Sequence, residues 1–291
     1  MGTFIQADNF SKIAPYFKLF LQGTAVTILL SVFTVIIGFI LALILAVMRL
    51  SKCCPFAFLG TDKNGRLRDG GFLAALSRFN PLAFLATAYV EILRSTPVLV
   101  QVFIIYYGIF GALITLPKFT ILGFIKFDRF FPGVVALGMN SGAYLCEIIR
   151  SGIQSIDGGQ TEAARSLGMT QTQNMRFIIL PQAIKNILPA LANEFIMVIK
   201  DTSLASTFFI GDLMTQCLLI KGTTYLTMEP LIMVAVVYFV LTFILTKLLA
   251  VFENGDEGSF VGESQNGLYP VVARYDDKTL IVEIDDIETG A

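Results

Sequence analysis

Long apolar runs alternate with short polar segments along the chain, and this pattern predicts a helical membrane protein. The first run, between Lys18 and Arg49, contains no charged residue. A helix needs about 20 mostly apolar residues to cross a bilayer, so this run is long enough to cross with tilt. Four further apolar runs follow. The predicted spans are residues 20–48, 82–113, 131–154, 186–208 and 230–250.

The Lys and Arg residues between the spans predict the orientation, because cytoplasmic loops carry an excess of positive charge. One side has ten cations: Arg49, Lys52, Lys63, Arg66, Arg68, Arg78, Arg150, Arg165, Arg176 and Lys185. The opposite side has six: Lys12, Lys18, Lys118, Lys126, Arg129 and Lys221. This bias places the N-terminus outside. Five spans then place the C-terminus in the cytoplasm.

The polar segments divide the chain into three predicted parts. Residues 1–18 carry apolar positions at helical spacing and predict a helix on the outer membrane surface; these positions are Phe10, Ile13, Ala14 and Phe17. Residues 19–252 form the membrane domain, with a cytoplasmic insertion at 52–80 that is rich in glycine and charge. Residues 253–291 hold ten acidic and two basic residues. In this acidic tail, β-branched runs flank residues 276–278 and predict a β-hairpin.

One cytoplasmic segment, within residues 157–182, predicts two short helices joined by a sharp turn. It reads TEAARSLGMTQTQNMRFIILPQ over residues 161–182. Thr161 is a suitable N-cap, and Gly168 supplies the left-handed residue that ends a helix. Thr170 and Gln173 then form a capping box, and the second helix is expected to stop at Pro181.

Two other interpretations of this segment stay open: a connector that lies on the membrane, and a DNA-binding helix-turn-helix. The second is disfavoured because its recognition helix would hold one arginine and no lysine, whereas DNA binding requires cations that neutralise phosphates.

Composition excludes most catalytic chemistry. The chain is 55% hydrophobic and 15% charged, and it contains no histidine. The absence of histidine removes the Ser-His-Asp and Cys-His nucleophiles and histidine metal sites. Four cysteines, at 53, 54, 146 and 217, form no CxxC pair. The glycine-containing stretch at 60–67 has Arg66 and Leu67 where a P-loop requires Lys and Ser or Thr. We therefore expect a non-enzymatic chain that binds no metal and no cofactor.

Several motifs resemble ABC importer permeases. EAARSLGM, followed by FIILPQAIKNILPALANEF, resembles the EAA loop of that family, and the similarity is greatest to the branch that takes up polar amino acids. Three further stretches agree in the expected order: YVEILRSTPVLVQ at 89–101, GAYLCEIIRSGIQSI at 142–156 and IKDTSLAS at 199–206. The insertion at 52–80 and the tail beyond Phe252 depart from the family pattern.

The resemblance implies a five-span subunit, similar to type I importers, in a bacterial plasma membrane. It implies a second permease subunit, identical or closely homologous, and an external solute-binding protein that delivers the amino acid. It also implies a separate cytoplasmic ATPase, which holds ATP and magnesium and accepts the EAA helix in a cleft. The residues assigned to this coupling are Glu162, Ala163, Ala164, Arg165, Leu167, Gly168 and Met169.

Polar residues inside the predicted spans are candidates for the substrate pathway, because burying them in a bilayer is costly. They are Glu91, Arg94, Gln101, Asn140, Tyr144, Asn193, Glu194, Lys200 and Asp201. A zwitterionic amino acid needs partners of both signs, and these residues supply both. The alternative is structural: Glu91–Arg94 and Glu147–Arg150 are i,i+3 pairs that can neutralise each other on one helix face.

Small residues and prolines in the spans predict helix packing. Gly138 and Gly142 form a GxxxG pattern, which favours close approach of two helices. Pro97 is expected to bend the second span, and Pro181 and Pro189 are assigned to packing as well. A stand-alone secondary transporter or channel is a further alternative. Such carriers usually have more spans and an internal inverted repeat, which the sequence lacks. A membrane-tethered helix-turn-helix regulator is more remote.

Overall fold

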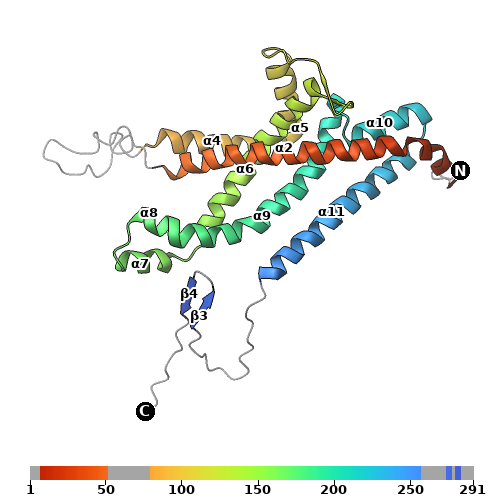
Figure 1. Cartoon of the computed structure of the whole chain (residues 1–291). Coiled ribbons are helices and arrows are strands. Elements are labelled where there is room, and N and C mark those ends of the chain that lie inside the picture. Colours follow the sequence, from red (N-terminus) through yellow and green to blue (C-terminus); the bar gives the residue numbers. More distant parts are fainter. Residues whose placement is uncertain (1–6, 52–78, 257–272, 277–278, 283–291) are drawn as a thin grey trace. The chain divides into compact units, whose positions relative to one another are not determined.

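The computed structural model describes residues 7–51, 79–256, 273–276 and 279–282, and these are almost entirely helical (Figure 1). The N-terminal half contains α1 (Ala7–Ile13), the 3-10 turn η1 (Ala14–Tyr16), α2 (Phe17–Leu50), α4 (Pro81–Ser95), α5 (Val98–Phe103) and the π-helix η3 (Ile104–Phe110). A short hairpin follows, β1 (Thr120–Ile121) and β2 (Ile125–Lys126). Then come α6 (Phe127–Gln154), α7 (Gly158–Ser166), α8 (Gln171–Asn174), the π-helix η4 (Met175–Ile179), α9 (Leu180–Asp201), the 3-10 helix η5 (Thr202–Phe208), α10 (Leu213–Thr224) and α11 (Met228–Asp256).

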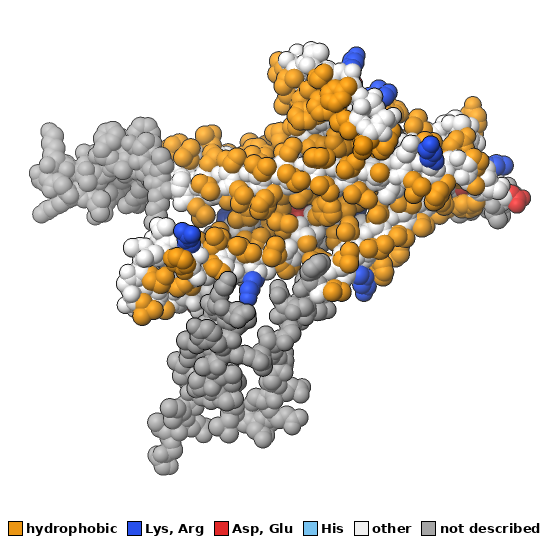
Figure 2. All heavy atoms as spheres, viewed as in Figure 1, with side chains coloured by type: hydrophobic (Ala, Val, Ile, Leu, Met, Phe, Trp, Pro, Cys, Tyr) orange, Lys and Arg blue, Asp and Glu red, His pale blue; other side chains and the backbone are white. Residues whose placement is uncertain are grey.

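The described helices include two to four candidate membrane spans, against the five that the sequence predicts. The segments Asp8–Leu50 and Met228–Val251 are long and apolar enough to cross a membrane, and two bent helix pairs raise the number to four. Hydrophobic side chains cover most of the face shown in Figure 2. Helix α6, which contains the predicted third span, is less apolar. It lies in the centre of the bundle, where small and polar residues pack against other helices instead of lipid.

Helix α6 packs most extensively on α2, and the two backbones approach closely at three glycines. A Cβ atom on Gly38 would lie 3.2 Å from the carbonyl oxygen of Gly138 and 3.2 Å from the nitrogen of Gly142. A side chain there would force the neighbouring atoms to move, so the GxxxG pair lies at the close α2–α6 crossing. The second most extensive packing of α6 is against α9.

The predicted second span is two helices. Helix α4 ends at Ser95, Thr96 and Pro97 are extended, and α5 with η3 leaves at 112° to α4. Proline disfavours helical geometry in the residue before it, so Pro97 separates two helices where the sequence predicted a bend. Helix α10 was not predicted from the sequence, because its 12 residues are too few to form a membrane span.

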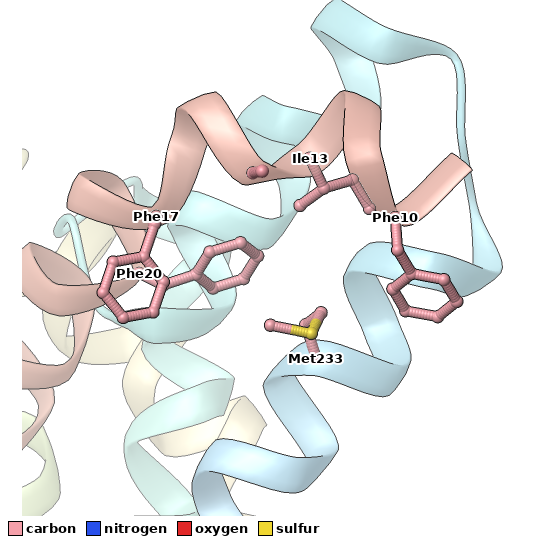
Figure 3. Close-up of a pocket in the computed structure, with 6 residues that line it drawn as sticks. Phe10, Ile13, Phe17, Phe20 and Met233 are labelled. Carbon is pink, nitrogen blue, oxygen red and sulfur yellow. The ribbon is translucent and has the colours of Figure 1, made fainter. Parts of the chain in front are cut away.

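The N-terminal helix α1 continues through η1 into α2, and its apolar positions face α11 (Figure 3). Phe10, Ile13, Phe17 and Phe20 line a cavity of about 400 Å³ together with Met233 and Ala14. The Asn9 side-chain amide donates to Glu229 Oε1 at 2.8 Å. Part of the face that the sequence assigns to the membrane surface therefore packs against protein.

The acidic tail forms a separate unit from Ala250 onward. Within it, β3 (Ala273–Asp276) pairs antiparallel with β4 (Thr279–Val282) where the sequence predicts a hairpin, with Ala273 opposite Val282 and Asp276 opposite Thr279. Most of the predicted insertion at 52–80, the first six residues, and residues 257–272, 277–278 and 283–291 lie outside the described part of the chain.

Candidate functional site

Residues 157–182, which the resemblance assigns to coupling, are called the coupling segment below. Its first helix, α7, begins earlier than predicted. Its N-cap is Asp157, whose Oδ1 accepts from the backbone N–H of Gly159 at 2.6 Å. Aspartate is as good an N-cap as threonine, and the two glycines after it do not prevent helix formation. Thr161 lies inside the helix, where its Oγ1 accepts a hydrogen bond from Asn174 Nδ2 at 3.2 Å. The prediction of Thr161 as the cap was therefore wrong.

The turn after α7 has the predicted geometry. Gly168 has φ +78°, in the left-handed region. Its N–H donates to the carbonyl of Arg165 at 2.9 Å, and the N–H of Met169 donates to that of Ala164 at 3.0 Å. These two bonds are the Schellman pattern, which satisfies carbonyls at a helix C-terminus. The predicted capping box of α8 is also confirmed, since Thr170 and Gln173 exchange both bonds.

The second helix of the segment does not stop at Pro181. Helix α8 runs through the π-helix η4 into α9, so Pro181 falls in the first turn of α9. Proline is tolerated there because the π-helical turn η4 directly before it changes the hydrogen-bond register. As a result, the coupling segment is continuous with a helix of the membrane domain.

Most coupling residues lie on an exposed surface. Ala164, on the inner face of α7, is 1% exposed, whereas Leu167 is 82% exposed. Glu162, Ala163 and Arg165 are exposed as well. Two residues that fix the position of this surface, Asp157 and Asn174, were not predicted. An aspartate directly before a glycine pair was a usable signal for the first, and nothing local pointed to the second.

Two pathway candidates meet at the α4–α5 break. The buried Gln101 side chain donates from Nε2 to the carbonyls of Leu93 and Thr96 at 2.7 and 3.0 Å, and to Thr96 Oγ1 at 2.7 Å. Its Oε1 accepts from Asn140 Nδ2 on α6 at 2.9 Å. Gln101 therefore satisfies carbonyls that α4 leaves open where it ends, and it connects this break to α6.

Other candidates pair across helices in ways that the sequence did not predict. The Arg94 guanidinium lies 5.5 Å from the ring centre of Tyr144. Within the described ranges no ion pair joins Arg94 to Glu91. Glu194 Oε1 accepts from Ser141 Oγ at 3.0 Å, which connects α9 to α6.

The second i,i+3 pair belongs to a larger cluster. Glu147 pairs with Arg150 on α6, as predicted, and also with Arg49 NH1 on α2 at 2.8 Å. Arg49 Nε donates to Thr87 Oγ1 on α4 at 3.2 Å. This cluster joins three helices near the end of the bundle that leads to α7, so its geometry is that of a structural ion pair.

The remaining candidates are not brought together. In the part of the chain that the structure describes, no hydrogen bond or ion pair connects Glu91, Asn193, Lys200 or Asp201 to another candidate. The described residues also contain no group of three or more Cys, Asp or Glu side chains with metal-binding geometry.

Comparisons with known proteins agree on the family. The family model described as binding-protein-dependent transport system inner membrane component matches residues 70–255. The arginine transport system permease protein ArtQ of Bacillus subtilis is 36% identical over 82% of this chain and 92% of its own length. The probable glutamine ABC transporter permease protein GlnM of the same organism is 35% identical over 80% of this chain and 91% of its own length.

A solved structure gives the same result. A chain of an amino acid ABC transporter crystallised with histidines is 39% identical, with a TM-score of 0.70 over 84% of this chain and 98% of that chain. The methionine transporter MetNI, at 18% identity and a TM-score of 0.53, shares the fold. Because the family model matches well over half of the chain and the relatives align over most of it, this chain belongs to the family of binding-protein-dependent transport system inner membrane components.

Proposed function

We propose that this chain is the permease subunit of an ABC importer that carries a polar amino acid. The named functions of its relatives, arginine and glutamine transport, support an amino acid as the substrate class. Both signs of charge among the polar residues of α4 and α9 support a zwitterionic substrate. A separate ATPase supplies the energy; the sequence supports this because Arg66 and Leu67 stand where a P-loop requires Lys and Ser or Thr.

The observation that carries the proposal is the exposed helix α7 with its rigid attachments. Three residues separate the end of α6 from the start of α7, and the Gly168 turn leads directly into the continuous helix α8–η4–α9. The Asn174–Thr161 hydrogen bond holds the two sides of this turn together. A displacement of α7 by a bound ATPase would thus be passed to α6 and α9, the helices that contain Asn140 and Glu194.

The remaining assignments belong to the same proposal. The subunit crosses the bacterial plasma membrane five times, with its N-terminus outside and its C-terminus in the cytoplasm. It pairs with a second permease subunit, identical or homologous, and receives its substrate from an extracytoplasmic binding protein. Glu162, Ala163 and Gly168 contact the ATPase, while Arg94 and Glu194 contact the substrate. The acidic tail, residues 253–291, is a regulatory or interaction module.

The coupling assignment is tested by co-purification with the cognate ATPase. Glu162→Lys and Gly168→Leu are expected to abolish co-elution and ATP-driven uptake. Gln160→Lys is the matched control, because Gln160 is exposed on α7 but lies outside the motif. If both motif variants bind the ATPase and couple hydrolysis to uptake as the control does, the docking assignment is wrong. Uptake in vesicles that lack the ATPase would instead indicate a stand-alone carrier.

The pathway assignment needs a separate measurement. Arg94→Ala and Glu194→Ala are expected to reduce substrate uptake while co-elution with the ATPase is retained. Unchanged uptake in an assembled complex would remove these residues from the pathway and leave the Glu194–Ser141 bond as a structural contact.

A further inference from the structure

The hairpin β1–β2 stands at the opposite end of α6 from the coupling segment. Strand β2 runs directly into α6, and α7 begins three residues after α6 ends. Helix α6 has 28 residues, and at the helical rise of 1.5 Å per residue it is about 42 Å long. This exceeds the roughly 30 Å of a bilayer's hydrocarbon core. If α7 is cytoplasmic, the hairpin therefore lies on the outer side of the membrane, at or beyond the lipid headgroups.

Positive charge collects around a hollow at this end of α6. The hollow has a volume of about 320 Å³ and is lined by Lys118, Lys126 and Arg129, with Phe119, Thr120 and one acidic residue, Asp128. Three cations face one anion, so the hollow favours a negatively charged occupant. Cations are less common on the outer side of bacterial membrane proteins than on the cytoplasmic side, which makes this cluster unusual for its location.

Aromatic contacts hold the hairpin firmly on α6. The rings of Phe119 and Phe127 stack with centres 4.6 Å apart, and Phe127 stacks on Phe131 at 5.4 Å. The backbone N–H of Phe127 donates to the carbonyl of Phe119 at 3.0 Å. A displacement of the hairpin by a bound ligand would therefore be passed to α6, the helix that leads to α7.

Two exposed apolar residues at this end of the molecule have unfavourable backbone geometry. Leu122, at the hairpin turn, has φ +53° and is 68% exposed; Phe209, between η5 and α10, has φ +52° and is 51% exposed. A left-handed conformation is strained for bulky residues. The carbonyl of Phe209 accepts from Arg129 NH1 at 3.2 Å, which places Phe209 next to the charged hollow. Strain of this kind concentrates at binding sites.

We propose that the hairpin and the first turn of α6 form the docking surface for an acidic patch on the extracytoplasmic binding protein. A carboxylate side chain of the partner enters the hollow between Lys118, Lys126 and Arg129, while Leu122 contacts an apolar area beside that patch. A protein partner fits this site better than lipid, because α6 is longer than the hydrocarbon core is thick and the hairpin lies at its outer end. This inference rests on the proposed function.

The test uses the permease and its ATPase in proteoliposomes, with purified binding protein loaded with substrate. ATP hydrolysis is measured against the concentration of binding protein. The double variant Lys118→Glu/Lys126→Glu is expected to raise the half-saturating concentration at least about 10-fold, and Leu122→Asn several-fold, since asparagine tolerates the left-handed turn. Raising salt from about 50 to about 300 mM is expected to weaken the wild type more than the double variant, because salt screens exposed charges.

Lys221→Glu is the matched control, because Lys221 is an exposed cation on the same predicted side but outside the hollow. A half-saturating concentration equal to that of this control would overturn the proposal. If the double variant fails to assemble, Lys118→Gln/Lys126→Gln provides the same comparison with neutral side chains. If binding protein does not stimulate the wild type at all, the proposed function fails instead. If the substitutions change only the response of hydrolysis to phosphatidylglycerol content, the surface binds lipid and the docking proposal is wrong.

Discussion

Replacing Gly168 by alanine isolates the contribution of one backbone conformation to ATPase coupling. Gly168 has φ +78°, and a Cβ atom built there has no neighbour within 4 Å. The substitution therefore introduces no clash, and its cost is the left-handed conformation of an L-residue, about 1–2 kcal/mol. Because about 1.4 kcal/mol corresponds to a factor of ten, the population of the correct turn relative to alternatives should fall by roughly 5- to 30-fold.

Gly158 is the matched control within the same segment. It begins α7, has no positive φ, and also has open space around its Cβ position. Gly158→Ala should leave coupling unchanged or stabilise α7 slightly, by about 0.4–1 kcal/mol, because alanine loses less entropy in a helix. Gly168→Asn should lie between the wild type and Gly168→Ala, since asparagine visits the left-handed region more readily.

The assay titrates purified ATPase against the permease in detergent and follows amide hydrogen exchange in α7. Gly168→Ala is expected to weaken ATPase binding and to speed exchange of the α7 amides by a similar factor. Equal binding and equal exchange for Gly168→Ala and Gly158→Ala would refute the reasoning, because the two substitutions differ only in backbone conformation.

Three further substitutions test packing and polar contacts. Gly38→Leu should destabilise the α2–α6 crossing by at least about 1–3 kcal/mol, seen as a lower melting temperature in detergent, whereas a melting temperature equal to that of Gly222→Leu, where the Cβ position is open, would contradict the packing. Gln101→Leu removes the donor that satisfies the end of α4 and should cost about 1–3 kcal/mol; faster proteolysis near the α4–α5 break is expected, and unchanged proteolysis would argue against it. Asn174→Leu removes the bond to Thr161 and is expected to lower substrate uptake while the melting temperature in detergent changes little. Equal uptake in Asn174→Leu and wild type would show that the Thr161 bond has no role in coupling.

Local sequence determined the features that depend on neighbouring residues. The Gly168 turn and the Thr170 capping box were predictable because both involve hydrogen bonds between residues at most five positions apart. The error at Thr161 arose because two good capping residues, Asp157 and Thr161, lie about one helical turn apart, and local rules do not rank them.

Whether a helix ends at a given proline depends on contacts that only the tertiary structure shows. The sequence predicts a bend at Pro97 and a helix end at Pro181, yet α4 ends just before Pro97 and the helix continues through Pro181. At Pro97 the side chain of Gln101 satisfies the freed carbonyls, so a 112° break is stable. At Pro181 the π-helix η4 absorbs the change in register, and the continuous helix packs against α6.

The helical membrane class and the two short helices joined at Gly168 follow from the sequence alone, because apolar run length and capping residues are local properties. Which polar residues meet depends on the tertiary structure. Gln101 pairs with Asn140, 39 positions away, and Arg49 pairs with Glu147, 98 positions away. Such contacts follow from the angles at which helices cross, and these are set by close packing at residues such as Gly38 rather than by the spacing of the polar residues themselves.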